Sequence, residues 1–179
     1  DSRTKVAIIG DSYAQDLVNA FFEGEISQHF QISTHYIRAI CGNLYLEEDF
    51  SSNLAPQDRE QCRTLGWYQV PKLIEILQQA DMIWLASSWK IWEVELLPKS
   101  IENLQRDFQI PVFVFGRKAF GEVQLRKLLK ASLEERLKFQ NPLDPFHITV
   151  NRRMREFLSE NQWIDISSLI CAEETQCHL

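Results

Sequence analysis

The sequence predicts an α/β domain built on a parallel sheet with helices on both of its faces. The chain alternates short apolar runs, which are typical of buried strands, with longer segments whose apolar residues recur at helical spacing. Such alternation favours parallel strands joined by crossover helices. The 179 residues, 45% of them hydrophobic, are enough for one domain with a substantial core. We therefore expect residues 1–179 to form a single domain.

Five segments are predicted as strands because they are short, rich in apolar or β-branched residues, and bounded by turn-forming residues. The first, "KVAIIG", ends in Gly10, and the fourth, "IPVFVFG", lies between Pro111 and Gly116. The second, "FQISTHYIRAI", alternates loosely and ends just before Cys41. The complete set is 5–10, 30–40, 81–89, 110–116 and 163–170.

The segments between these strands are predicted as helices, apart from one irregular loop. Pro71 lies near the first turn of one helix, where its missing N–H is tolerated. Residues 44–62 are polar and contain a proline, so we expect a loop there. Two prolines in "NPLDP" (141–145) separate the last two helices. The predicted helices are 11–24, 68–80, 93–108, 122–139 and 148–161.

Charge and hydropathy argue against two classes of partner. The formal net charge is −6, so the chain lacks the basic footprint of a nucleic-acid-binding protein. The basic cluster "RRMR" (152–155) is expected to be the solvated face of a helix. No apolar run approaches the roughly 20 residues that span a bilayer. Because the chain starts at Asp1 without a signal peptide, we expect a processed protein or an excised fragment.

The four cysteines form two local pairs. Cys41 with Cys62, and Cys171 with Cys177, could each close a modest loop. An even count in such pairs favours disulfides and an oxidising compartment. Zinc binding is a weaker alternative because neither pair has the short Cys-x-x-Cys spacing, and four reduced, buried cysteines are another.

The stretch "IIGDSYAQDLVNAF" places Asp11 and Ser12 between the first strand and the first helix. Ser12 could cap that helix, since serine and aspartate are both favoured caps. It could also be a nucleophile, because sites form at the carboxyl ends of parallel strands and helix N-termini attract negative charge. Gly42, after the second strand, and Ser88, after the third, are expected at the same edge and favour the second interpretation.

These residues resemble the first block of the SGNH (GDSL-like) hydrolase superfamily. More narrowly, the chain is similar to the SGNH domain of transmembrane acyltransferases that O-acetylate bacterial surface polysaccharides. This similarity rests on "YIRAICGN", "ILQQADMIWLASSW", "IPVFVFG" and "VNRRMREFL…IDISSLICAEETQC", which together cover nearly the whole chain. The resemblance implies a three-layer, flavodoxin-like sandwich with five parallel strands. It also implies a periplasmic domain attached to the inner membrane, and an excised or C-terminally incomplete part of a larger membrane protein.

The resemblance also implies roles for individual residues. Ser12 is the expected nucleophile, and its own N–H and that of Gly42 are the expected oxyanion donors. The third block of the family supplies an asparagine, but here the sequence is "ASSW", so Ser88 or Trp89 takes that place and Asn43 is a nearby substitute. The implied partners are a surface glycan acceptor and a transmembrane acyltransferase domain that supplies acetyl groups. No cofactor or metal is expected.

A serine nucleophile needs a general base, usually a histidine oriented by a carboxylate. "DPFH" gives Asp144 and His147 the Asp-x-x-His spacing of the family, but it precedes the last predicted helix and strand, whereas the family motif follows the fifth strand. His178 follows that strand but lacks an aspartate three positions earlier. We therefore expect the true Asp-x-x-His after Leu179, and little activity from this chain alone. The other histidines, expected in surface or packing roles, are His29 and His35.

Two alternatives to an acetyltransferase stay open. An esterase of the same fold would remove acetyl groups from a glycan, because water and a sugar hydroxyl are both oxygen nucleophiles. A non-catalytic glycan-binding module would use Gly-Asp-Ser only as a capped turn. In that module Trp84, Trp89 and Trp92 could stack on sugar rings, although tryptophans near a strand are more often part of the core.

Overall fold

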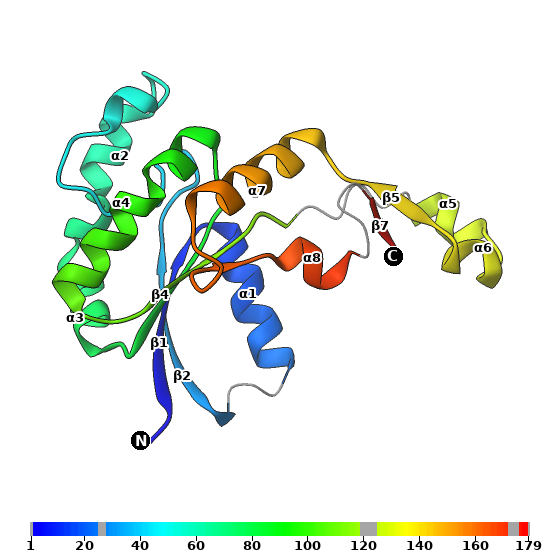
Figure 1. Ribbon diagram of the computed structural model, residues 1–179, viewed down its shortest axis with the longest axis horizontal. Helices are drawn as coiled ribbons and strands as arrows, with labels where there is room; N and C mark the ends of the chain where they lie inside the picture. The colour runs from blue at the N-terminus through cyan, green and yellow to red at the C-terminus, as the bar shows by residue number, and fades with distance from the viewer. Residues whose placement is uncertain (1, 25–27, 119–124, 172–175, 179) are drawn as a thin grey trace.

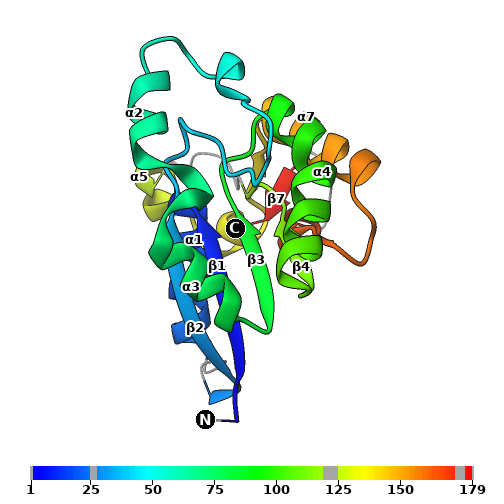
Figure 2. The ribbon, with the colours of Figure 1, turned by 90° about the vertical axis from the view of Figure 1, so that its left-hand side faces the viewer.

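The computed structural model describes residues 2–24, 28–118, 125–171 and 176–178. Five parallel strands form one sheet in the order β2-β1-β3-β4-β6, with helices on both faces (Figure 1, Figure 2). The predicted α/β class, with its flavodoxin-like strand order, is therefore confirmed.

The sheet brings the carboxyl ends of its central strands to one edge. Its strands are β1 (Thr4–Gly10), β2 (Phe30–Tyr36), β3 (Met82–Ala86), β4 (Val112–Phe115) and β6 (Trp163–Ile164). In the register of β1 with its two neighbours, Gly10 lies opposite both Tyr36 and Ala86. A Cβ atom on Gly10 would lie 1.8 Å from the Ala86 carbonyl oxygen. Only glycine therefore allows this close approach where β1 ends.

Two apolar layers hold the helices on the sheet. Because successive side chains of a strand point to opposite faces, Val6 and Ile8 of β1 pack on one side, and Ala7 and Ile9 on the other. The first layer lies against α1 (Ser12–Glu23) and the short α8 (Ile166–Ile170). The second, larger layer lies against α3 (Pro71–Gln79), α4 (Ile91–Phe108) and α7 (Pro145–Phe157).

Three predicted strands are too long. The predicted strand 81–89 is a strand only at Met82–Ala86, and the Ser88 N–H beyond it donates to Asp11 instead of to a neighbouring strand. β2 ends at Tyr36: the Ile37 N–H makes the last hydrogen bond to β1, at the Gly10 carbonyl (2.8 Å), and the chain then turns, with the Cys41 N–H donating to the Arg38 carbonyl (2.8 Å). The segment 163–170 is a strand only at Trp163–Ile164. Asp165 then caps α8 by accepting a hydrogen bond from the Ser168 N–H (3.2 Å), so the rest of the apolar run is helical.

The segments around the prolines also differ from the prediction. The predicted helix 122–139 is two helices in its described part, α5 (Leu125–Lys130) and α6 (Leu133–Leu137). Ser132 separates them, because its hydroxyl caps α6 at the Glu135 N–H (3.2 Å). The strands β5 (Gln140–Pro142) and β7 (Gln176–His178) form a small antiparallel sheet that the sequence analysis missed. This sheet lies with α5 and α6 to one side of the main sheet (Figure 1).

The predicted loop 44–62 contains short helical turns. These are a 3₁₀ turn at Ser51–Asn53 and the first part of α2 (Arg59–Leu65), followed by a second 3₁₀ turn at Trp67–Gln69. On α7 the three arginines of "RRMR" are exposed and Met154 is buried, as predicted for a solvated helix face. No helix in the described ranges has the length and apolar character to cross a membrane.

Cys41 and Cys62 form the predicted disulfide, which closes the 41–62 loop that follows β2. Cys171 is also disulfide-bonded. The side chain of its expected partner, Cys177, lies outside the described residues. Within the part of the chain that the structure describes, there is no free cysteine and no cluster of three or more metal-ligating side chains.

Candidate active site

Four loops meet at the carboxyl edge of the sheet and carry most of the residues singled out by the sequence. Ser12 begins α1, Gly42 follows β2, Ser88 follows β3, and Arg117 follows β4. Asp11 joins the first and third loops, because its Oδ2 accepts a hydrogen bond from the Ser88 N–H (2.8 Å). The sheet therefore places the predicted nucleophile and its predicted oxyanion donors on one edge.

Asp11, and not Ser12, caps the first helix. The Asp11 side chain is 2% exposed, and its Oδ1 accepts a hydrogen bond from the Tyr13 N–H (2.9 Å). Ser12 is then the first helical residue, and it is exposed. Its hydroxyl makes no hydrogen bond with any other described residue. Because the capping role is filled by the neighbour, the Ser12 hydroxyl is available for chemistry.

Two backbone N–H groups at this edge have no acceptor among the described residues. Neither the Ser12 N–H, in the first turn of α1, nor the Gly42 N–H donates to another described residue. Gly42 has a φ of +79°, and a Cβ atom there would lie 2.7 Å from Cη2 of Trp92. Glycine is thus required where this N–H is presented. Unpaired amides of this kind are suited to hold a developing oxyanion.

The backbone around Gly42 is held from several sides. Glu93 of α4 accepts hydrogen bonds from the Asn43 N–H (3.1 Å) and, with its other oxygen, from the Lys90 N–H (2.7 Å). Trp67 Nε1 donates to the Cys41 carbonyl (2.8 Å). Burial raises the pKa of Glu93, while the nearby Lys90 charge and the two backbone hydrogen bonds oppose that rise. Glu93 therefore ties the loop after β2 to the loop after β3. Nothing in its helical context revealed this role in the sequence.

Asn43 does not serve as an oxyanion donor in this structure. Its Nδ2 donates to the Ile9 carbonyl (3.1 Å) and to Ser87 Oγ (3.0 Å), which uses both amide hydrogens. Its Oδ1 accepts from the buried Tyr68 hydroxyl (2.7 Å). The residue is 2% exposed and fully satisfied. We assign it a structural role in fixing the loop behind Gly42, which corrects the expectation from sequence.

The third-donor position is occupied by a serine and a buried tryptophan. Trp89 is 0% exposed, and its Nε1 donates to the Phe115 carbonyl (2.8 Å), so it can neither hold an oxyanion nor stack on a sugar. The half-buried Ser88 uses its N–H on Asp11, but its hydroxyl makes no hydrogen bond within the described residues. Ser88 is therefore the remaining side-chain candidate for a third donor.

Asp144 and His147 do not form a catalytic dyad. Asp144 is exposed and caps α7, because its Oδ1 accepts from the Phe146 N–H (2.8 Å). His147 instead receives a hydrogen bond on Nδ1 from Arg117 Nε (3.1 Å). Burial and the Arg117 charge together lower the pKa of His147, against a smaller opposing effect of Asp144. The lowered pKa favours the neutral ring, but its Nδ1 is oriented by a cation rather than by a carboxylate.

Neither His29 nor His35 forms a hydrogen bond with Ser12 in the described part of the chain, although His35 lines a cavity together with Asp11. His29 is exposed, before β2, and His35 is half-buried within β2. Burial lowers the pKa of His35. The side chain of His178 lies outside the described residues.

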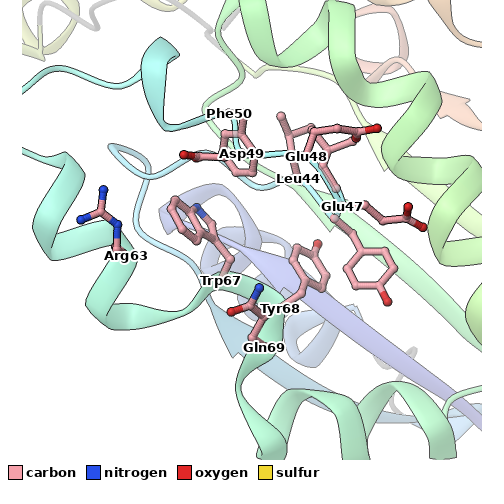
Figure 3. Close-up of a pocket in the computed structure, with 11 residues that line it drawn as sticks. Leu44, Glu47, Glu48, Asp49, Phe50, Arg63, Trp67, Tyr68 and Gln69 are labelled. Atoms are coloured by element: carbon pink, nitrogen blue, oxygen red, sulfur yellow. The ribbon is translucent and has the colours of Figure 1, made fainter.

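Three cavities surround this edge. One of about 200 Å³ lies between the first turn of α1 and β2, and includes Asp11 and Tyr36. A second, of about 340 Å³, lies beside the Cys41–Cys62 disulfide and is lined by Tyr36 and Trp67. The third, of about 450 Å³, is lined by residues 44–50 and by side chains following α2 (Figure 3). Tyr68 belongs to this third cavity and donates to Asn43, so it links the cavity to the site.

Comparison with known families agrees with the resemblance to SGNH domains found in the sequence. Residues 1–179 match the family described as an SGNH domain fused to AT3 domains. No curated protein matches the chain in sequence. The matched region contains the whole sheet and all four edge loops. The chain therefore belongs to the family of SGNH domains that are fused to AT3 domains.

Proposed function

We propose that this chain is a serine acyltransferase domain that moves an acetyl group to a hydroxyl of a bacterial surface polysaccharide. The observation that carries this proposal is the exposed Ser12 hydroxyl at the carboxyl edge of the sheet, where neither this hydroxyl nor the N–H groups of Ser12 and Gly42 have a partner among the described residues. Membership of a family fused to AT3 domains supports an association with acyl transfer. The periplasmic location and the membrane partner that supplies acetyl groups are parts of the same proposal.

The proposed reaction has two steps through an acyl-serine. In the first, Ser12 Oγ attacks the carbonyl carbon of the donor acetyl group while a general base takes the hydroxyl proton. The bond to the donor breaks, and the leaving group receives that proton. In the second, the sugar hydroxyl attacks the acyl-serine, its proton passes to the base, and Ser12 Oγ leaves and regains a proton. The N–H groups of Ser12 and Gly42 stabilise the oxyanion in both steps, and loss of one such donor typically costs about 10²–10³ in rate.

We propose that the general base lies in an Asp-x-x-His motif that follows Leu179. His147 is a poor candidate because its Nδ1 already accepts the Arg117 proton. A base of this type needs one ring nitrogen directed at the serine and the other donating to a carboxylate.

Labelling with a fluorophosphonate tests the proposal. We expect Ser12 to be modified rapidly in a chain extended past Leu179 and at least a hundredfold more slowly in residues 1–179. Ser12→Ala must abolish labelling, whereas Ser33→Ala, at an exposed serine in β2, must not change it. No labelling of the extended chain would favour a glycan-binding module. Rapid labelling of residues 1–179 that is lost in His147→Ala would refute our placement of the base.

Product analysis separates a transferase from an esterase of the same fold. With an acetyl donor and an acceptor glycan, a transferase gives acetylated glycan in a Ser12-dependent manner. Release of free acetate from an already acetylated glycan, without transfer to a second glycan, would identify an esterase instead.

A further inference from the structure

Arg117 is held in place at the end of β4 by its own backbone. Its N–H donates to Asn151 Oδ1 (2.8 Å), and its carbonyl accepts from Asn151 Nδ2 (2.9 Å) and from Ser167 Oγ (3.0 Å). Asn151 belongs to α7 and Ser167 to α8, so helices from both faces of the sheet fix this residue. The direction of the Arg117 side chain is therefore set by the fold.

The guanidinium of Arg117 is buried without a carboxylate. Arg117 is 7% exposed, and its Nη1 donates to the Trp89 carbonyl. Its Cζ lies 5.8 Å from the Tyr13 ring centroid and 5.0 Å from that of Phe146. Within the described ranges, no acidic side chain lies within ion-pair distance of it. Burying an unpaired charge is costly, and carbonyl and aromatic contacts offset only part of that cost.

Arg117 and His147 present two donors to each other. Because His147 Nδ1 accepts from Arg117 Nε, the neutral ring carries its proton on Nε2. That nitrogen lies 3.4 Å from Arg117 Nη2, which has hydrogens but no lone pair to offer. The Nη2–H group of Arg117 and the Nε2–H group of His147 are both donors, so they cannot form a hydrogen bond with each other. An anionic oxygen placed between them would accept from both.

We propose that Arg117 and His147 bind a carboxylate of the acceptor glycan, which would make that acceptor an acidic polysaccharide. The inference rests on the proposed function and specifies its substrate class. Nε and Nη1 of Arg117 already donate to His147 and Trp89, so Nη2 of Arg117 and Nε2 of His147 are the two N–H donors left, and the two oxygens of one carboxylate can accept one hydrogen bond from each. Tyr13, which the guanidinium faces, follows Ser12 in the first turn of α1. A sugar held by its carboxylate at Arg117 therefore lies on the same edge as the nucleophile.

Binding of methyl β-D-glucuronide, followed through the His147 ring signals by NMR, tests the site. A bound anion stabilises the imidazolium, so the glucuronide is expected to raise the pKa of His147 in a saturable way. The neutral methyl β-D-glucoside is expected to leave it unchanged. Arg117→Gln and Arg117→Lys should each weaken glucuronide binding at least tenfold. Arg152→Gln, at an exposed arginine of α7, is the matched control and should bind normally.

The assay is independent of catalysis. Ser12→Ala is expected to bind the glucuronide as the parent chain does, so absence of acyl transfer and absence of this site give different results. Equal responses to glucuronide and glucoside, or undiminished glucuronide binding in a folded Arg117→Lys variant, would overturn the proposal. The last measurement uses a chain extended past Leu179. If its His147 pKa is already raised without ligand and the glucuronide adds no shift, the carboxylate comes from the protein itself and the proposal fails.

Discussion

Replacing Asp11 by alanine tests whether one buried carboxylate holds the carboxyl edge together. Asp11 caps α1 at the Tyr13 N–H and also accepts from the Ser88 N–H in the loop after β3. Asp144 is a matched comparison, because it caps α7 at the Phe146 N–H but is exposed, and its side chain accepts no second hydrogen bond from the described residues. The two variants differ mainly in the link between loops.

The size of the effect follows from these contacts. Loss of an N-cap costs about 1 kcal/mol, and leaving the partly buried N–H of Ser88 unpaired adds about 1–3 kcal/mol. We therefore expect Asp11→Ala to lower the free energy of unfolding by about 2–4 kcal/mol, and Asp144→Ala by about 1 kcal/mol. At about 2–4 °C per kcal/mol for a domain of this size, the Tm should fall by about 5–15 °C and about 2–4 °C, respectively.

Urea titrations of the two variants, followed by far-UV circular dichroism, measure the difference directly. A change in midpoint at constant slope reports a change in stability rather than in the denatured state. If Asp11→Ala loses no more stability than Asp144→Ala, the hydrogen bond to Ser88 contributes nothing, and the edge is held by other contacts.

Three further changes probe the same edge. Burial raises the pKa of Glu93, so its protonated form stabilises the folded state fully below the unfolded pKa of 4.5, and this stabilisation is lost as the pH rises through the folded pKa. Glu93→Gln should therefore flatten the decline in the free energy of unfolding above pH 4.5, as measured by urea titrations at several pH values. An unchanged slope of that free energy against pH would contradict this. Replacing Cys41 and Cys62 together by serine should lower the free energy of unfolding by about 3 kcal/mol, because the disulfide no longer restrains the unfolded loop; a loss below about 1 kcal/mol would argue against that restraint. Arg117→Gln should raise the pKa of His147, measured by NMR without ligand, since the opposing charge is removed; a pKa that stays put would place the cause in burial alone.

The fold was predictable because its elements carry clear periodic patterns. Runs such as "KVAIIG" and "IPVFVFG" are buried on both faces and read as continuous apolar segments, as expected for central parallel strands. The failure at 163–170 has a local cause. The apolar run is interrupted by Asp165, and an aspartate can cap a helix as readily as it can end a strand. The pairing of β5 with β7 joins segments far apart in the sequence, and the residue pattern of neither segment indicates the other as its partner.

The candidate site was only partly predictable for a related reason. The position of Ser12 and Gly42 follows from a general rule, that strand ends of a parallel sheet share one edge. The role of Asn43 depends instead on its partners. Tyr68 and Ser87 come from different loops, and only the folded chain shows that they consume the amide. Arg117 carried a usable signal, since it directly follows the fourth predicted strand, but its burial without a carboxylate partner among the described residues is a property of packing.

The spacing Asp-x-x-His illustrates why a motif alone does not assign a base. In the sequence "DPFH", Asp144 precedes a proline at the first helical position, and this is also the pattern of a capped helix. The structure adopts the cap, so the carboxylate faces a backbone N–H and the imidazole reaches Arg117. A catalytic histidine donates from one nitrogen to a carboxylate and keeps a lone pair for the serine on the other. In His147 the hydrogen bonding is reversed: the Nδ1 lone pair accepts a hydrogen bond from a cation, and the proton is on Nε2. That arrangement suits a ring that binds an anion, and it is the reason why we propose a different group as the base for Ser12.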